Sequence, residues 1–503
     1  MNNPKVIIIG FDGGTWKALK PMLEKGELPA LKKIIDRGVS SNLLSTVPCR
    51  SGVAITTFYT GKNPCKWGLL DFPCFDPDVV RYEKIREKHK AVWDILGNHD
   101  KKSAVVNLPA TFPPTPTRGV MVAGFSVSED YDYTYPKEFK EKIAGFHSER
   151  EVFLQMIRGT LRVGRSYEKS KELREFYLKN VKKRYELIKS TLGDKNFDFA
   201  LFWIDETDAI FHEGWGKEDF ILPFFREMDK ILGDVAQNNP EADIMVISDH
   251  GFDASPSCEF YPKAFLEKEG YLKLKGPWIH GFLVKLVNTM AVKSVYPFRY
   301  RYIERLFAIY NKIKKSSAKE KIIPQNPNWR QAREGRVQSR AIGIDWQKTV
   351  ATNHDFWGIK ILKENLTRDY EVVRKEIMEK MMNLHDKYGR KVIRSVWRRE
   401  EIFSGPDLQE FPDIVYLSTN LFEPTGFLPF CVTRQKSKKS SFPGDHLTSR
   451  DGIFAASGPH IKNIGDLGEV NILDLAPTIL KLFGVDKPKD MDGRILEEII
   501  KEL

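Results

Sequence analysis

Six short runs of apolar and β-branched residues recur along the 503-residue chain, separated by longer amphipathic stretches. Most of the runs are almost continuously hydrophobic, which is typical of strands buried on both faces of a parallel sheet. They are residues 6–10, 104–107, 199–204, 244–248, 414–417 and 453–456. Helical patterns lie between the runs, for example at 173–192 and 224–235. The alternation predicts an α/β fold with a doubly wound, mostly parallel central sheet flanked by helices.

The pattern changes between residues 253 and 347, where the chain is basic, aromatic-rich and helical, without a clear buried run. A strand-like stretch returns at 357–362. We therefore predict two parts. Residues 1–252 and 348–503 form the core, and residues 253–347 form a helical cap insertion.

The charge is concentrated in one segment of the predicted insertion. From Lys285 to Arg340 the chain has fourteen Lys and Arg residues and three acidic ones, so this segment accounts for the whole net charge of +11. A basic segment is typical of contact with an anionic membrane or with nucleic acid. A solvated, charged helix face explains the same composition equally well. No obligate protein partner is evident.

We expect no secretory signal, because residues 1–4 lead directly into an apolar run, and we find no uninterrupted run of about 18 apolar residues that would span a membrane. It contains five cysteines, an odd number, without a C-x-x-C pair. Reduced thiols are the simplest interpretation, and we expect a cytoplasmic protein.

Polar residues that follow the predicted strands are candidates for chemistry, because parallel α/β sheets bind ligands beyond the carboxyl ends of their strands. Asp12 follows the first run, and Asp249 and His250 follow the run 244–248. An adjacent carboxylate and imidazole at a buried strand end are costly to desolvate without partners, so we interpret this pair as metal ligands. Asp12 alone is more typical of an ordinary turn.

A second group of candidates lies after the run 199–204 and in a late loop. Asp208 and His212 are four residues apart, so on one helical turn they face the same side, as two ligands of one metal must. Asp205 follows the strand directly and is the alternative ligand. His446 lies in a loop before the run 453–456, and it would fill the position that the other ligands leave open.

Ser51 precedes a predicted short helix at 52–59, which Gly61 would end. This placement predicts that Ser51 is the N-cap, and an ordinary capping serine is one interpretation. The other interpretation is a nucleophile, since a helix N-terminus and a metal both favour an alkoxide and a bound phosphate.

Together these residues suffice for two divalent ions. One ion would be held by Asp12, Ser51, Asp249 and His250, and the other by Asp208, His212 and His446. Mixed Asp and His ligands suit Zn²⁺, or Mn²⁺, better than Ca²⁺. Two such ions about 4 Å apart can clamp the attacking and leaving oxygens of an in-line phosphoryl displacement.

The order of these motifs resembles the alkaline phosphatase superfamily, in its type I phosphodiesterase/nucleotide pyrophosphatase family. The run VISDHGF at 246–252 carries part of the resemblance, and the Asp208 and His212 pair another. Similar sequence occurs at 6–13, 45–71, 344–346, 399–402, 444–446, 457–459, 474–478 and 491–494. The resemblance covers almost the whole chain except the basic insertion.

The resemblance implies a dinuclear site, usually zinc, with the seven residues above as ligands and Ser51 also as the nucleophile. A covalent phospho-Ser51 intermediate would form and then be hydrolysed. The substrate would be a phosphorylated small molecule or a nucleotide-like compound. Ser51 stands where this family more often has Thr, and Arg50 beside it is a candidate contact for non-bridging phosphate oxygens. The expected function is therefore metal-dependent hydrolysis of phosphodiester or pyrophosphate bonds.

Relatives with other activities are the alternatives. A sulfatase would need the motif C/S-x-P-x-R, but the residues two and four places after Cys49 are Ser51 and Val53. A phosphomonoesterase, a phosphomutase or a phosphotransferase belongs to the same superfamily. A protein that kept the fold and only binds anions or membrane surfaces is the non-enzymatic alternative; loss of a ligand position would favour it, and no ligand position is lost.

Overall fold

The computed structural model describes residues 5–68, 85–124, 132–143, 167–193, 196–275, 285, 343–354, 357–426, 428–436 and 443–502. The chain divides into two compact units. Unit 1 consists of Met1–Ser255, Ser404–Pro406 and Phe442–Leu503, and unit 2 consists of Pro256–Phe403 and Asp407–Ser441. Among the described residues, no helix is long and apolar enough to cross a membrane.

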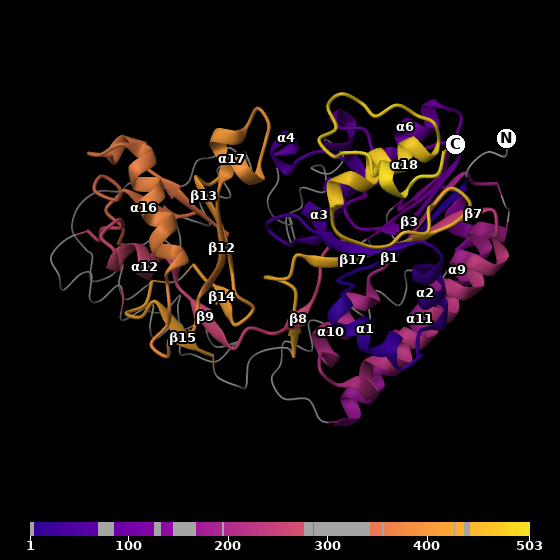
Figure 1. Ribbon diagram of the computed structural model, residues 1–503, viewed down its shortest axis with the longest axis horizontal. Coiled ribbons are helices and arrows are strands. Elements are labelled where there is room, and N and C mark those ends of the chain that lie inside the picture. The colour runs from indigo at the N-terminus through magenta and orange to yellow at the C-terminus, as the bar shows by residue number, and fades with distance from the viewer. Residues whose placement is uncertain are drawn as a thin grey trace. The chain divides into compact units, whose positions relative to one another are not determined.

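Unit 1, in which Figure 1 labels the strands β1, β3, β7 and β17, contains a nine-stranded sheet with the order β18-β2-β17-β7-β1-β6-β3-β4-β5. The strands β7, β1, β6, β3 and β4 run parallel to one another, whereas β17 is antiparallel to β7 and β2, and β5 to β4. The bounds are β1 Lys5–Phe11, β2 Val39–Leu44, β3 Ser103–Leu108, β4 Gly119–Ala123, β5 Thr134–Tyr135, β6 Phe199–Ile204, β7 Ala242–Ile247, β17 Asp451–Ser457 and β18 Gly465–Asn471. The predicted doubly wound, mostly parallel sheet is confirmed.

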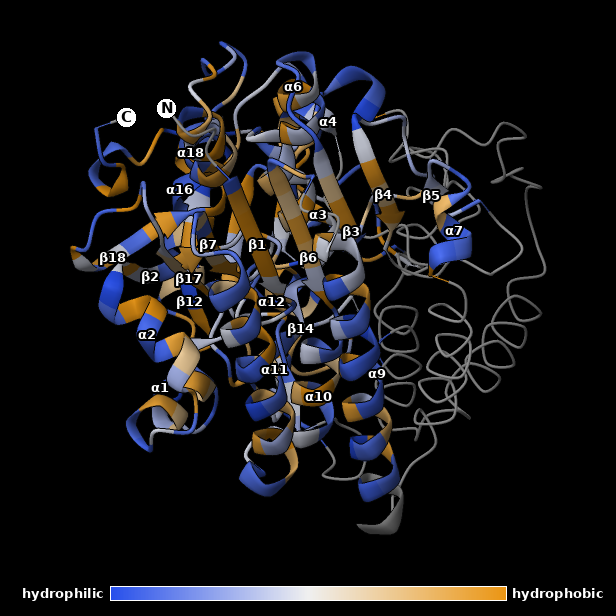
Figure 2. Ribbon diagram, turned by 90° about the vertical axis from the view of Figure 1, so that its right-hand side faces the viewer, coloured by the Kyte–Doolittle hydropathy of each residue, from blue (hydrophilic) through white to orange (hydrophobic). Residues whose placement is uncertain are grey.

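Helices cover both faces of this sheet, and each face has its own hydrophobic core (Figure 2). Side chains alternate along β1, so Ile7 and Ile9 enter one core while Val6 and Ile8 enter the other. The first core includes residues of α1 Trp16–Glu24, α2 Pro29–Arg37, α9 Tyr167–Gly193, α10 Glu206–Gly214 and α11 Glu218–Asn238. The second includes residues of α3 Ser51–Thr60, α6 Val92–Asn98 and α18 Leu475–Leu482. Burial on both faces explains the continuous hydrophobic runs of the central strands.

Unit 2 is built differently, around a four-stranded antiparallel sheet with the order β10-β11-β13-β12. A smaller three-stranded sheet has the order β14-β9-β15. The strands are β9 Cys258–Phe260, β10 Ala351–Asn353, β11 Gly358–Ile361, β12 Ile393–Arg398, β13 Ile414–Ser418, β14 Phe422–Pro424 and β15 Thr433–Gln435, with the helices α12 Pro262–Lys268, α16 Tyr370–Met382 and α17 Arg399–Ile402.

One strand prediction was wrong in its placement. The run 414–417 is β13 of the antiparallel sheet in unit 2 and does not belong to the central parallel sheet. All five residues of β13 are buried, so its sequence has the same continuous hydrophobicity as a central parallel strand. The helix predictions at 173–192 and 224–235 are confirmed within α9 and α11.

The second unit is larger than the predicted insertion 253–347. It also contains 348–403 and 407–441, which the sequence analysis assigned to the core. Strands β10, β11 and β13 contribute most of their residues to a separate hydrophobic core, and hydrophobic periodicity alone does not tell such strands from those of the main sheet. Of the basic segment that begins at Lys285, only Lys285 lies among the described residues, where it forms an ion pair with Glu267 at 2.7 Å.

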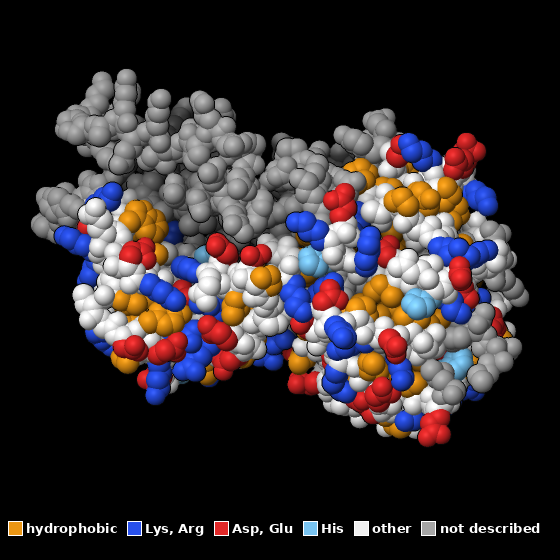
Figure 3. Space-filling view, turned by 90° about the horizontal axis from the view of Figure 1, so that it is seen from above, with side chains coloured by type: hydrophobic (Ala, Val, Ile, Leu, Met, Phe, Trp, Pro, Cys, Tyr) orange, Lys and Arg blue, Asp and Glu red, His pale blue; other side chains and the backbone are white. Residues whose placement is uncertain are grey.

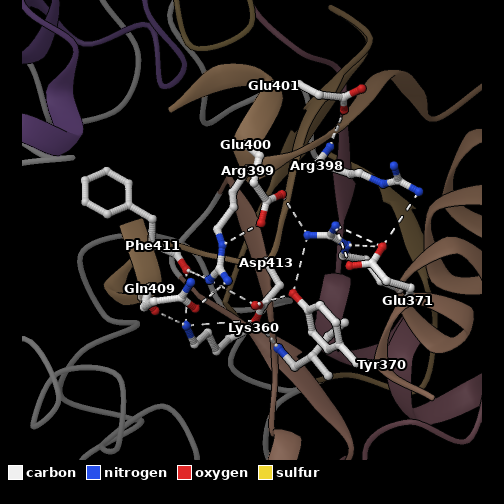
Figure 4. A network of polar contacts seen from close by, with 12 residues as sticks. Lys360, Tyr370, Glu371, Arg398, Arg399, Glu400, Glu401, Gln409, Phe411 and Asp413 are labelled. Atoms are coloured by element: carbon white, nitrogen blue, oxygen red, sulfur yellow. Dashed lines mark hydrogen bonds and ion pairs between the residues drawn. The ribbon is translucent and has the colours of Figure 1, made fainter. Parts of the chain in front are cut away.

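A network of polar contacts joins β11, α16, α17 and the residue before β13 in unit 2 (Figure 4). Its centre is Asp413, which is fully buried and accepts hydrogen bonds from the Ile361 N–H at 2.7 Å and the Tyr370 hydroxyl at 2.8 Å. The buried Arg399 guanidinium lies 3.0 Å from Asp413, and Lys360 lies 3.9 Å away. Both oxygens of this buried carboxylate are therefore satisfied by the protein itself.

Candidate metal centre

The carboxyl end of β1 places Asp12 at the site. Gly13 turns the chain with φ +67°, and a Cβ atom there would lie 2.9 Å from the Phe252 ring, so only glycine fits. The Asp12 side chain is 2% exposed. Its Oδ2 accepts a hydrogen bond from the Trp203 indole N–H at 2.9 Å, whereas its buried Oδ1 has no hydrogen-bond partner.

The end of β7 places Asp249 and His250 directly beside Asp12. The His250 Nε2 atom lies 3.3 Å from Asp249 Oδ2 and 3.6 Å from Asp12 Oδ1. Asp249 Oδ1 accepts the Gly13 N–H at 3.1 Å, and its buried Oδ2 has no hydrogen-bond partner. Ser248 points elsewhere, because its hydroxyl donates to the Gly14 carbonyl and accepts the Ile453 N–H.

Ser51 is the first residue of α3, and its Oγ lies 3.1 Å from His250 Nε2. The prediction that Ser51 is the N-cap was wrong: the N-cap is Arg50, which has an extended backbone and makes no side-chain capping bond. The helix therefore begins one residue earlier than predicted. Gly61 ends it in a left-handed conformation, as predicted.

Asp208 and His212 lie on α10, and His446 follows β16 Gly444–Asp445. Asp208 Oδ2 is 3.5 Å from His212 Nε2, and Asp208 Oδ1 is 3.8 Å from His446 Nε2. The rings of His250 and His446 stack with their centroids 4.0 Å apart. Two strand ends, two helices and one loop thus bring the predicted residues together within unit 1.

The three histidines share one pattern of hydrogen bonding. The Nδ1 atoms of His212, His250 and His446 lie 2.9, 3.0 and 3.3 Å from the backbone carbonyls of Gly444, Gly251 and Cys49. A proton on Nδ1 satisfies each carbonyl and leaves the Nε2 lone pair directed toward the carboxylates. Metal-binding histidines are commonly oriented by such contacts.

The donor atoms fit two metal ions. The ligand atoms of Asp208, His212 and His446 lie within 4.8 Å of one another, and so do those of Asp12, Asp208 and His250. Asp208 belongs to both groups, which differs from the predicted division of the ligands. Buried oxygens of Asp12, Asp208 and Asp249 lack hydrogen-bond partners in the described structure. Ligand atoms of a tetrahedral ion with bonds of about 2.0–2.1 Å would lie roughly 3.3 Å apart, close to the separations seen here.

The electrostatics also favour a cation. Burial raises the pKa of Asp12 well above its usual value, and the carboxylates of Asp249 and Asp208 raise it further. Burial likewise raises the pKa of Asp208. Burial lowers the pKa of His446 well below its ordinary value, and so do the nearby His250 and His212. Each shift favours the neutral form of the group, and bound divalent ions would reverse this balance for the carboxylates.

The alternative ligand Asp205 has other partners. Its carboxylate forms an ion pair with Arg184 and accepts a hydrogen bond from the Asn107 amide at 3.0 Å. Arg184 also binds Glu206, whose pKa burial raises to about 7. The structure therefore favours Asp208 over Asp205 as the candidate metal ligand.

Arg50 lies near enough to His446 for its positive charge to contribute to lowering the pKa of that histidine.

Comparison with known proteins shows the family of this chain. The model of the type I phosphodiesterase/nucleotide pyrophosphatase family matches residues 6–342, and the chain belongs to this family. The expected enzyme class, a hydrolase of phosphoric ester bonds, is thereby confirmed. The family depends on a dinuclear metal centre.

Solved structures with a similar fold include an inactive variant of murine ectonucleotide pyrophosphatase/phosphodiesterase 5 in complex with AMP. It is 13% identical, with a TM-score of 0.51, over 99% of this chain and 100% of that one. The human protein of the same name is 14% identical over the same shares of the two chains, with a TM-score of 0.48. A comparison with curated proteins gives no match.

Proposed function

We propose that this protein hydrolyses a phosphodiester or pyrophosphate bond at a centre of two divalent ions, through a covalent phospho-Ser51 intermediate. One observation carries the proposal: the Ser51 hydroxyl lies 3.1 Å from His250 Nε2, beside buried carboxylate oxygens that have no hydrogen-bond partner. A serine in that position is the expected nucleophile of a metal-assisted displacement.

The ligands would be divided between two metal positions. Asp12, Asp249 and His250 would hold one ion together with Ser51, while His212 and His446 would hold the other and Asp208 would contribute to both. We propose zinc, with manganese as the alternative, because the donors are mixed carboxylates and imidazoles. When bound, the ions lower the pKa of coordinated oxygens and stabilise charge on the phosphoryl group.

The chain itself supplies the nucleophile and its orientation. Ser51 is the first residue of a ten-residue helix, so the partial positive charge of the helix N-terminus favours a phosphoryl group there. The Ser51 Oγ–phosphorus bond forms while the bond from phosphorus to the leaving oxygen breaks. Water then breaks the Oγ–phosphorus bond, which restores Ser51 and releases the phosphorylated product. Arg50 is the candidate contact for the non-bridging oxygens.

A nucleotide-like phosphodiester is the proposed substrate class. The family membership supports it, as does the AMP complex of the murine protein with a similar fold.

The decisive experiment compares bis-aryl and mono-aryl phosphates as substrates of the metal-loaded protein and its Ser51→Ala variant. We expect preference for the diester and a loss of at least roughly 10³-fold in kcat for the variant, because the nucleophile is gone. Ser45→Ala is the matched control, since the Ser45 hydroxyl is also buried but makes no hydrogen bond. Equal activity of Ser51→Ala would contradict the nucleophile, and preference for the monoester would contradict the diesterase.

Contact of the segment from Lys285 to Arg340 with an anionic membrane or nucleic acid is a separate proposal. It rests on the composition of that segment. On the face shown in Figure 3, the Lys and Arg side chains of the described residues are interspersed with Asp and Glu. Binding of the full chain to anionic vesicles or to DNA should weaken steeply with salt. Binding that does not respond to salt would contradict the proposal.

A cytoplasmic location is proposed from the sequence alone. Cell fractionation tests it, and recovery of the protein outside the cytoplasm would contradict it.

A further inference from the structure

The indole of Trp203, which packs against one face of the central sheet, contacts a candidate ligand of the metal centre. Trp203 lies in β6, is 1% exposed and packs in the second hydrophobic core. Its N–H donates to Asp12 Oδ2 at 2.9 Å. This bond satisfies one oxygen of the carboxylate and leaves Oδ1, which lies 3.6 Å from His250 Nε2, as the oxygen without a hydrogen-bond partner.

The neighbouring strand makes room for the ring. Gly10 of β1 lies opposite Trp203 in the parallel register. A Cβ atom at Gly10 would lie 2.0 Å from Cε3 of the indole, so any side chain there would displace the ring. Glycine in a buried strand commonly marks such a close approach.

The backbone around both residues is also fixed. The Asn107 amide donates to the Trp203 carbonyl at 3.0 Å, and the Thr207 hydroxyl donates to the Asp12 carbonyl at 2.6 Å. The Asp12 N–H donates to the Ile204 carbonyl at 3.1 Å. With the main chain held, the freedom of Asp12 lies in its two side-chain torsions, and the terminal one is broad unless a hydrogen bond restricts it.

We propose that Trp203 is a positioning residue, whose indole N–H holds Asp12 so that Oδ1 alone is presented to the ion. The proposal rests on the proposed function in one respect, namely that Asp12 is a metal ligand. It adds a residue that does not touch the ion or the substrate and acts only through Asp12.

Trp203→Phe removes the donor and keeps an aromatic ring. We expect the affinity for one of the two ions to fall about 10- to 100-fold, the usual effect of removing a contact that orients a ligand. The affinity for the other ion should be unchanged. The measurement is titration of the metal-free protein with Zn²⁺ against a chromophoric chelator. Trp93→Phe is the matched control, because Trp93 is also buried and its N–H makes no hydrogen bond.

An Asp12→Ala background separates positioning from a general structural role. That variant keeps Asp208, His212 and His446, and adding Trp203→Phe should leave its remaining Zn²⁺ affinity unchanged. A residue that only supports the fold would weaken binding in this background too, so additive losses would overturn the proposal. Trp203→Phe affinities within twofold of the wild type would also overturn it. If Trp203→Phe does not fold, Gly10→Ala is measured in its place, with the same expected and contradicting results.

The two proposals fail in different ways. A wild-type protein that binds no Zn²⁺ contradicts the metal centre itself. A wild-type protein that binds two ions, with a Trp203→Phe variant that binds them equally well, contradicts only the role of Trp203.

Discussion

Asp413 in unit 2 and the Asp12–Asp249 pair in unit 1 are equally buried, yet their surroundings differ in kind. Asp413 receives a backbone N–H, a tyrosine hydroxyl and the Arg399 guanidinium (Figure 4). Asp12 and Asp249 each keep one oxygen without a hydrogen-bond partner in the described structure. Among the described residues, the ion pairs join both of them to His250 and neither of them to a Lys or Arg.

The difference separates a structural role from a functional one. A buried carboxylate needs compensation, and the chain supplies it completely at Asp413. At Asp12 and Asp249 the chain supplies it only in part, which agrees with the proposed binding of a cation there. Burial of an acidic residue is therefore weak evidence for function until its partners are known.

Asp249→Ala tests the functional side and should have the largest effect. Because the variant loses a proposed metal ligand, we expect diesterase activity to fall by roughly 10³-fold or more. Circular dichroism should show a folded protein. Asp413→Ala is the comparison: its activity per folded molecule should be much less affected. Similar losses of activity per folded molecule in both variants would contradict the distinction between a functional Asp249 and a structural Asp413.

Asp413→Ala tests the structural side. The substitution removes the buried carboxylate beside Arg399, which keeps only the partly exposed Glu400 as its acidic partner, and we expect unit 2 to lose about 3–5 kcal/mol of stability. Amide hydrogen exchange of β12 and β13, measured in increasing urea, reports the stability of unit 2 separately. The double variant Asp413→Leu/Arg399→Met should be less destabilised than Asp413→Ala, because the buried guanidinium is removed together with its buried partner. Unchanged exchange in Asp413→Ala would contradict the structural role.

The effect of Asp12→Asn on stability should change sign when the protein binds metal. In the metal-free protein it removes an uncompensated buried charge, so we expect stability to be equal or higher by on the order of 1 kcal/mol. With saturating Zn²⁺ the wild type gains binding free energy that the variant lacks, and the order should invert. Thermal melting with and without Zn²⁺ measures both values. The same order under both conditions would show that Asp12 does not bind the ion.

Glu376→Gln is expected to have the smallest effect, because this carboxylate is partly exposed. Hydrogen bonds from Tyr271 and Arg368 lower its pKa to about 2. A lowered pKa contributes stability at pH values above its ordinary value of 4.5, and the contribution is lost as the pH falls toward 2. The variant should therefore be slightly less stable than the wild type at pH 7, with the difference shrinking below pH 4.5. Denaturation at several pH values tests this, and a pH-independent difference would contradict it.

Much of this site was predictable from strand ends. Asp12, Asp249 and His250 directly follow buried runs, and the parallel arrangement of β1 and β7 brings such positions together. The shared position of Asp208 was not predictable, since it depends on how α10 approaches His250 and His446. The N-cap error at Ser51 arose because Arg50 has an extended backbone that its residue type does not indicate.

Two further features could not be predicted from sequence patterns, for physical reasons. The run 414–417 is buried on both faces in an antiparallel sheet, so its periodicity equals that of a central parallel strand. Trp203 looks like any core aromatic residue in its strand. The signal that could have revealed it is Gly10 in the neighbouring buried run, because a glycine there indicates that a large side chain approaches closely.

The central claim is that the buried, incompletely compensated carboxylates of unit 1 hold two divalent ions. Elemental analysis of the purified, Zn²⁺-equilibrated protein tests it most directly, together with the Asp208→Ala variant, because Asp208 belongs to both ligand groups. We predict two ions per chain in the wild type and fewer than one in the variant. A wild type without bound metal, or a variant that keeps both ions, would contradict the account.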